Sequence, residues 1–255
     1  MKRRQFLIAA GWVAFGMAAT PGILVANPLS GERTAPCAGR QPEQGFRFVL
    51  QGDSVTWWAR ESDAPDTDPR AWGTGYAAII GKRLTAAFPQ HGLAFYNRGV
   101  SQNRVYDLQN RWNNDVLQLK PGLLSILIGV NHRLEDDFAA FETTYRQLLE
   151  TTRAQLPGVV FVLGLPFIAP VGEFEENYER YRADIDRRDD IVKRIAADFD
   201  AVTVDYPALF DKAAESTPYS HLIYDGLHPT PAGYELMANE WIRVVGERLP
   251  CFKEL

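Results

Sequence analysis

Short apolar segments alternate with longer amphipathic ones from residue 46 to the C-terminus. Five apolar segments are rich in β-branched or aromatic residues and are closely followed by Gly, Asn or Pro, which is typical of strands. They are 46–51, 93–97, 123–128, 159–163 and 201–205. The segment 123–128 is apolar almost throughout, as expected for a strand that is buried on both faces of a parallel sheet.

Between these strands, apolar residues recur at helical spacing in 76–87, 141–152 and 185–196. A last helix is expected to start with Thr230 as N-cap and Pro231 at its first position. Alternating strands and helices predict one parallel sheet with helices on both faces. No composition break divides residues 46–255, although 57–72 and 166–179 are long connections of the kind that often carry function.

The N-terminus has the pattern of an export signal. Basic residues at 2–4 precede 14 apolar residues, 6–19, a run shorter than the roughly 20 that a membrane-spanning helix needs. Arg3-Arg4 before Phe6-Leu7 resembles a twin-arginine signal, which predicts export by that machinery to the periplasm or medium and no stable membrane anchor after cleavage near Ala26. We therefore expect a signal peptide (1–26), a lead (27–45) and one domain (46–255).

Composition narrows the function further. The 255-residue chain is 46% hydrophobic with a net charge of -5, and without residues 1–26 it has 24 basic and 32 acidic side chains, a net of -8. A negative chain argues against a nucleic-acid partner and favours neutral substrates. Its two cysteines, Cys37 and Cys251, either pair in the oxidising compartment or are unrelated thiols.

Polar residues collect where strands end, which is where open parallel sheets bind ligands. Four blocks stand out: Gly52-Asp53-Ser54, Asn97-Arg98-Gly99, Gly129-Val130-Asn131-His132 and Asp225-Gly226-Leu227-His228-Pro229. A serine is a weak nucleophile without a base, so Ser54 would need His228, and Asp225 could orient the imidazole. The amides of Ser54 and Gly99 and the side chain of Asn131 could bind an oxyanion.

These four blocks, in this order, resemble the SGNH or GDSL-type hydrolases over about residues 46–248. The resemblance implies a three-layer α/β/α fold with a flavodoxin-like parallel sheet of five strands, and ester hydrolysis without metal or cofactor. Block by block, it implies Ser54 as nucleophile, Asp225 and His228 as its partners, and Gly99 and Asn131 as oxyanion donors. The Gly-x-Ser-x-Gly elbow of ordinary α/β-hydrolases does not occur in the sequence.

One position departs from the family pattern, because His132 stands where an Asp commonly follows the Asn. His132 could touch substrate or serve a structural contact. Trp57 and Trp58, which follow the nucleophile, could stack on a sugar ring or an acyl chain, and Trp72 and Trp112 either join them or belong to the core. Three arginines, Arg60, Arg98 and Arg104, either face the cleft or are solvated.

We therefore expect an exported esterase that acts on short acyl, above all acetyl, esters of small or oligosaccharide substrates. A lysophospholipase or thioesterase of the same fold is the alternative within the enzymes, and a non-catalytic sugar-binding envelope protein is the alternative outside them. A metal site at His221, Asp225 and His228 has no recognised ligand spacing, so no metal is predicted.

Overall fold

The five apolar segments form the strands of one parallel sheet. The computed structural model of the protein describes residues 37–38 and 41–253. The strands are β3 (Arg47–Gly52), β4 (Ala94–Gly99), β5 (Leu123–Leu127), β6 (Val160–Gly164) and β7 (Val202–Val204). Their order, β4-β3-β5-β6-β7, confirms the predicted flavodoxin-like sheet.

The middle strand shows why the sequence folds in this way. All five residues of β5 are buried, so this strand is covered on both faces, as its continuous apolar pattern predicts. Its one polar residue, Ser125, accepts a hydrogen bond from the Trp241 indole at 3.0 Å. Burial of the Ser125 hydroxyl is therefore compensated.

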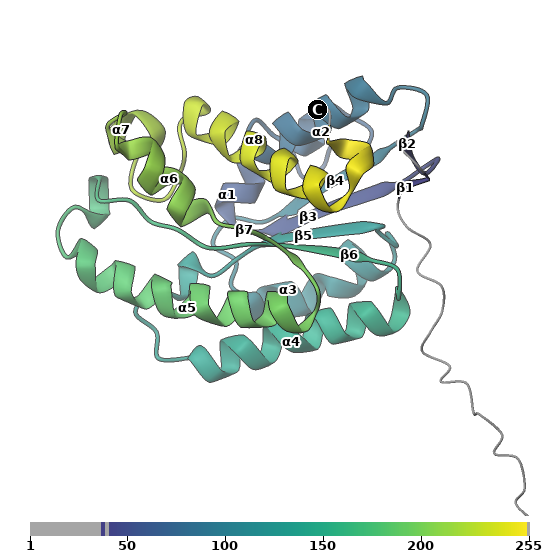
Figure 1. Ribbon diagram of the computed structural model, residues 1–255. Coiled ribbons are helices and arrows are strands. Elements are labelled where there is room, and N and C mark those ends of the chain that lie inside the picture. Colours follow the sequence, from purple (N-terminus) through teal and green to yellow (C-terminus); the bar gives the residue numbers. More distant parts are fainter. Residues whose placement is uncertain (1–36, 39–40, 254–255) are drawn as a thin grey trace, which may run out of the picture. The chain divides into compact units, whose positions relative to one another are not determined.

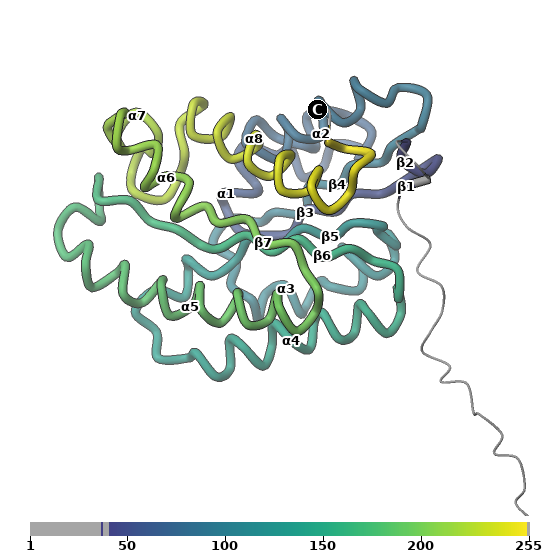
Figure 2. The backbone as a smooth tube through the Cα atoms, viewed as in Figure 1, coloured from purple at the N-terminus to yellow at the C-terminus, as the bar shows by residue number. Residues whose placement is uncertain are grey.

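Helices cover the sheet on both faces, and Figures 1 and 2 show the resulting three layers. One apolar cluster packs α2 (Tyr76–Ala87), α6 (Tyr206–Ala214) and α8 (Pro231–Arg248) on one face. A second cluster packs α3 (Val105–Trp112), α4 (Phe138–Gln155) and α5 (Tyr178–Asp198) on the other. The helix α8 starts with Thr230 as N-cap and Pro231 in its first turn, as predicted.

Short elements complete the chain. The helices α1 (Ser54–Trp57) and α7 (Tyr219–Leu222) lie near the carboxyl ends of the strands, and a π-helical turn (Asn113–Leu117) extends α3. Short 3-10 turns are Pro69–Trp72, Val130–His132, Gly172–Phe174 and Pro250–Phe252. The first three lie in the long connections or directly after a strand, and the last follows α8.

The lead is joined to the end of the chain. An antiparallel pair, β1 (Cys37–Ala38) and β2 (Gln41–Pro42), precedes the main sheet, and Cys37 forms a disulfide with Cys251, 214 residues later. Of the two alternatives for these thiols, the structure contains the pair.

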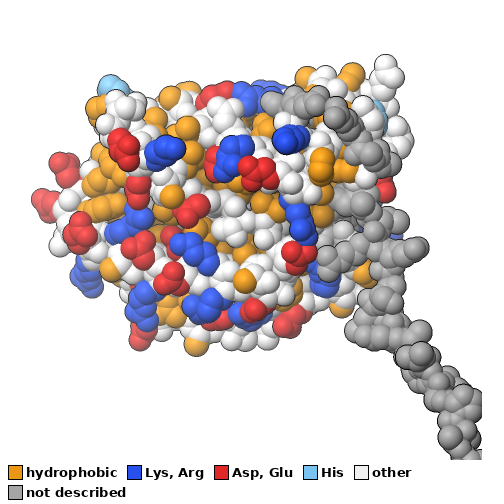
Figure 3. All heavy atoms as spheres, viewed as in Figure 1, with side chains coloured by type: hydrophobic (Ala, Val, Ile, Leu, Met, Phe, Trp, Pro, Cys, Tyr) orange, Lys and Arg blue, Asp and Glu red, His pale blue; other side chains and the backbone are white. Residues whose placement is uncertain are grey.

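Positive and negative side chains are intermixed over the face shown in Figure 3. No helix in the described part of the chain is long and apolar enough to cross a membrane, and the predicted signal peptide lies outside that part.

Candidate active site

Ser54 is positioned by the end of β3. Asp53 is the N-cap of α1, and its Oδ1 accepts the Val55 amide at 3.0 Å, so Ser54 is the first residue of the helix. The turn needs Gly52, because a Cβ there would lie 2.3 Å from the Thr56 hydroxyl oxygen. The sequence therefore presents the Ser54 hydroxyl at the carboxyl edge of the sheet, as expected.

The loop before α8 brings His228 to Ser54. His228 Nε2 lies 2.9 Å from Ser54 Oγ, and His228 Nδ1 lies 2.7 Å from Asp225 Oδ2. The other carboxylate oxygen of Asp225 accepts the backbone amides of Leu227 at 3.0 Å and His228 at 2.8 Å. Since a carboxylate only accepts, Nδ1 carries the proton and Nε2 is free to accept the Ser54 proton.

The electrostatics of the two carboxylates near Ser54 differ. Burial raises the pKa of Asp225, but the hydrogen bonds from His228 and from the amides of His228 and Leu227 outweigh it and hold the pKa below its usual value. Asp53 is fully buried, and this desolvation raises its pKa to about 7 despite its bond to the Val55 amide. Asp225 is thus the carboxylate suited to stabilise an imidazolium.

Gly99 has a different role from the predicted one. Its N–H donates to Asn97 Oδ1 at 2.9 Å, so this amide is already used. A Cβ on Gly99 would lie 2.3 Å from the Trp57 nitrogen and 2.7 Å from the Thr56 carbonyl carbon. The prediction that Gly99 is an oxyanion donor is therefore wrong, and glycine is needed because α1 packs directly on the end of β4.

The loop that follows Gly99 carries another backbone amide that could bind an oxyanion, the N–H of Gln102. Gln102 is exposed and has a φ of 64°, in the left-handed region that residues with a Cβ rarely adopt. On either side of it, the Val100 amide donates to the Gly52 carbonyl and the Asn103 amide donates to Val100. Asn131 Nδ2 donates to the Asn103 carbonyl at 3.0 Å, which leaves its second N–H available. Non-glycine residues in such conformations concentrate at functional sites.

His132 is buried, so of the two roles left open for it, substrate contact is wrong and the structural contact is the one that the structure shows. Its Nε2 accepts the Val105 amide at 3.0 Å, and its Nδ1 donates to Asp137 Oδ2 at 2.6 Å. Burial lowers the pKa of His132 although Asp137 opposes this, which favours the neutral ring. The buried Arg188 donates to Asp137 and to the His132 carbonyl. Together, Arg188, Asp137 and His132 hold the Asn131 loop against α3.

Glu135 lies near this group, and ligand atoms of His132, Glu135 and Asp137 fall within 4.8 Å of one another. Both imidazole nitrogens are already hydrogen-bonded, and Asp137 binds Arg188, so a cation there would have to displace these partners.

The four tryptophans after the nucleophile divide into two pairs. Trp72 and Trp112 are buried, and the Trp112 indole donates to Thr152 Oγ1 at 2.9 Å, so both belong to the core. Trp57 and Trp58 are half-buried, and the Trp58 ring centroid lies 5.2 Å from that of His228. Trp58 therefore remains a candidate for substrate contact, as does Trp57.

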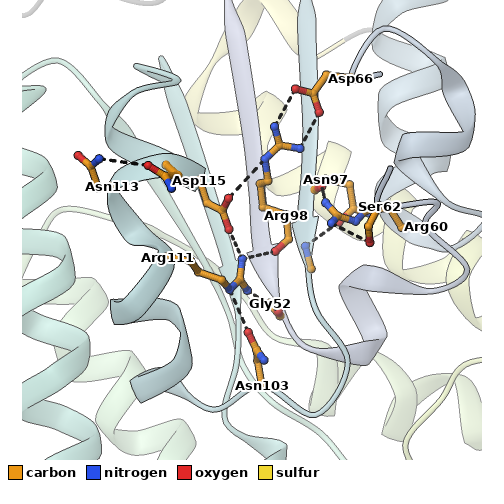
Figure 4. A network of polar contacts seen from close by, with 12 residues as sticks. Gly52, Arg60, Ser62, Asp66, Asn97, Arg98, Asn103, Arg111, Asn113 and Asp115 are labelled. Atoms are coloured by element: carbon orange, nitrogen blue, oxygen red, sulfur yellow. Dashed lines mark hydrogen bonds and ion pairs between the residues drawn. The ribbon is translucent and has the colours of Figure 1, made fainter. Parts of the chain in front are cut away.

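Arginines tie the 58–72 connection to the sheet (Figure 4). Arg98 binds both oxygens of Asp66 at 2.6 and 2.7 Å, and Arg111 donates to the Arg98 carbonyl at 2.7 Å. Arg111 also donates to Asn103 Oδ1 at 3.0 Å, and Arg60 donates to the Asn97 carbonyl. These side chains are engaged in structure rather than solvated, and Arg104 pairs with the partly exposed Glu135.

Sequence reasoning missed two residues beside the site, Gln102 and Tyr224. Tyr224 immediately precedes Asp225 and is 57% exposed. Its place next to the carboxylate of the fourth block was a usable signal. The strained φ of Gln102 has no signature in the sequence.

Residues 50–236 match the model of the GDSL-like lipase/acylhydrolase family. The chain belongs to this family. An acetylxylan esterase from Geobacillus stearothermophilus is 30% identical over 216 residues, which cover 79% of this chain and 94% of the relative. As in this family, the chain is a carboxylic ester hydrolase.

Solved structures agree with the family assignment. A Parabacteroides merdae protein assigned to the GDSL-like lipases is 30% identical, with a TM-score of 0.76 over 80% of this chain and 97% of that one. The crystal structure of an acetylxylan esterase from Geobacillus stearothermophilus is 28% identical, with a TM-score of 0.69 over 80% and 95% of the two chains. These similarities confirm the three-layer α/β/α fold.

Proposed function

We propose that this GDSL-family hydrolase is an exported serine esterase that removes acetyl and other short acyl groups from carbohydrate-like substrates. The observation that carries the catalytic part is the continuous hydrogen-bonded chain from Ser54 through His228 to Asp225. The carbohydrate part is supported by the related acetylxylan esterase.

In the proposed reaction, Ser54 Oγ attacks the ester carbonyl while His228 Nε2 takes the hydroxyl proton. Asp225 stabilises the imidazolium and holds its tautomer. His228 then gives the proton to the leaving alcohol oxygen, and an acyl-Ser54 ester remains. A water molecule then attacks this ester while His228 takes one of its protons. The bond between the acyl carbon and Ser54 Oγ breaks, His228 returns the proton to Oγ, and the acid is released.

The oxyanion of each tetrahedral intermediate needs donors. We propose the Ser54 amide, the second N–H of Asn131 and the Gln102 amide. The bond from Asn131 Nδ2 to the Asn103 carbonyl supports this set, because it brings the amide side chain to the loop that carries Gln102.

The test is mass-spectrometric detection of acetate loss from a panel of acetylated oligosaccharides. A profile with p-nitrophenyl acetate through decanoate runs beside it. Acetate release together with a preference for short acyl groups is the expected result. A clear preference for long acyl groups would point to the lysophospholipase or thioesterase alternative instead, and a wild-type protein that binds sugars without any hydrolysis would point to the binding protein.

Export rests on the sequence of residues 1–26 alone. We propose the twin-arginine route and a periplasmic or secreted location. Changing Arg3-Arg4 to Lys-Lys is expected to leave the unprocessed protein in the cytoplasm, as fractionation and immunoblotting would show. An unchanged distribution would contradict the route.

A further inference from the structure

An aromatic surface lies beside the His228 imidazole, and no step of the proposed reaction uses it. The Trp58 and His228 ring centroids are 5.2 Å apart, with 30° between the ring planes. Tyr224 stacks on Trp58 with 21° between the planes and 6.5 Å between the centroids. Behind Trp58 lies the buried Tyr234, 5.6 Å away, so Trp58 is backed by the core while Tyr224 faces solvent.

Tyr224 is unusual among the described residues. Only two large hydrophobic side chains in this part of the protein are exposed, Tyr224 at 57% and Leu134 at 39%, and Tyr224 is the one aromatic among them. The backbone holds both rings at the site. The Trp58 amide donates to the Ser54 carbonyl at 3.0 Å, and the Tyr224 amide donates to the His228 carbonyl at 2.8 Å. The main chain of each aromatic residue is thus tied to the main chain of one reacting residue.

The chemistry of the reaction indicates which part of the bound ester lies at this aromatic surface. The alcohol oxygen of the ester must lie against His228 Nε2, because that nitrogen supplies the proton with which the alcohol leaves. The carbonyl oxygen must lie toward the oxyanion donors. Trp58 lies beside the imidazole that supplies this proton, which favours the alcohol side of the ester for the aromatic surface.

We propose that Trp58 and Tyr224 form the subsite for the alcohol part of the ester, and that this part is a pyranose ring stacked on their exposed faces. The proposal rests on the proposed function and specifies its substrate. A flat aromatic surface matches the axial C–H face of a sugar ring, whereas a small alkyl alcohol is too small to cover it. Tyr224 is in this view a specificity-determining residue.

The experiment compares xylose tetraacetate with ethyl acetate, which carries the same acyl group on an alcohol without a ring. For Tyr224→Ala, we expect KM for xylose tetraacetate to rise roughly three- to tenfold with kcat unchanged, as loss of stacking in both ground and transition states predicts. KM for ethyl acetate should stay the same. Tyr224→Phe keeps the ring and should behave as wild type.

Leu134→Ala is the matched control, because it removes the other exposed hydrophobic side chain, and it should change neither substrate. Equal KM changes for both esters in Tyr224→Ala, or no change for either, would overturn the inference. Wild-type protein inactive on both esters would instead overturn the proposed function. Circular dichroism on each variant confirms that the fold is retained.

Discussion

His228 Nε2 lies 2.9 Å from Ser54 Oγ, although 174 residues of chain separate the two. This pair is the point at which the first and last blocks of the sequence meet. Ser54→Ala removes the nucleophile and leaves the buried surroundings intact. We expect kcat/KM for acetate release to fall by at least about 10³-fold, with an unchanged melting temperature. Equal rates in wild type and variant would exclude the proposed mechanism.

Asp225→Asn tests the third member of the chain. The amide has nearly the shape of the carboxylate, but it has no charge to stabilise the imidazolium, and it can turn an N–H toward His228 Nδ1. We expect kcat to fall by about 10⁴-fold, the size of this effect in a Ser-His-Asp protease, while KM changes little. Steady-state kinetics on p-nitrophenyl acetate measures both. A loss of less than about tenfold would mean that Asp225 only shapes the loop.

Gln102 allows a paired test of the oxyanion hole. Gln102→Gly keeps the N–H and relieves the positive φ, so it should retain activity and gain about 1 kcal/mol in the free energy of unfolding. Gln102→Pro removes the N–H and forces a negative φ, so kcat should drop by roughly 10²-fold. Urea unfolding and kinetics on the same preparations separate the two effects. A fully active Gln102→Pro variant would remove this amide from the site.

The buried carboxyl group of Asp189 should make the stability of the fold depend on pH. It is buried in α5, and this desolvation, the largest cause, raises its pKa to about 8. The unfolded state ionises near pH 4 and the folded state near pH 8, so the wild type loses stability as pH rises through this interval. Asp189→Asn cannot ionise, and its stability relative to wild type should grow between pH 5 and pH 8.5, by a few kcal/mol.

The measurement for Asp189 is the melting temperature at the two pH values. Asp190→Asn is the control, because that neighbouring side chain is exposed. A difference between Asp189→Asn and wild type that stays constant with pH would contradict the raised pKa.

The Cys37–Cys251 disulfide closes a loop across nearly the whole described chain. In the chain-entropy model, a link over this separation stabilises the fold by up to about 5 kcal/mol. The double variant Cys37→Ser, Cys251→Ser should therefore melt at a lower temperature, and a reductant should lower the wild-type value to match it. Alkylation without reduction should leave the wild-type mass unchanged. Any alkylation of the native protein would show that the thiols are free.

Local patterns were enough for the architecture. The five strands, the cap at Thr230, and the association of Ser54, Asp225 and His228 followed from periodicity, turn chemistry and resemblance. They could be predicted because each depends on neighbours in the sequence or on the general rule that parallel strands end at one edge. The disulfide was one of two alternatives, because distance between Cys37 and Cys251 is not encoded locally.

The site details depended on the tertiary structure. Gly99 was expected at the cleft because it closes the second block, and His132 was a candidate because it follows Asn131. The direction in which an amide or a side chain points from a turn is decided by what packs against that turn. The Gly99 amide turns to Asn97, and His132 turns inward to Val105 and Asp137.

The sequence by itself thus determined which residues reach the carboxyl edge of the sheet, since alternation and strand ends are local properties of the chain. Only the tertiary structure decided which of them face Ser54, and it added Tyr224 and Gln102. The physical reason is that a side chain's direction and exposure depend on contacts between segments far apart in sequence, such as α1 against β4 and Trp58 against Tyr224.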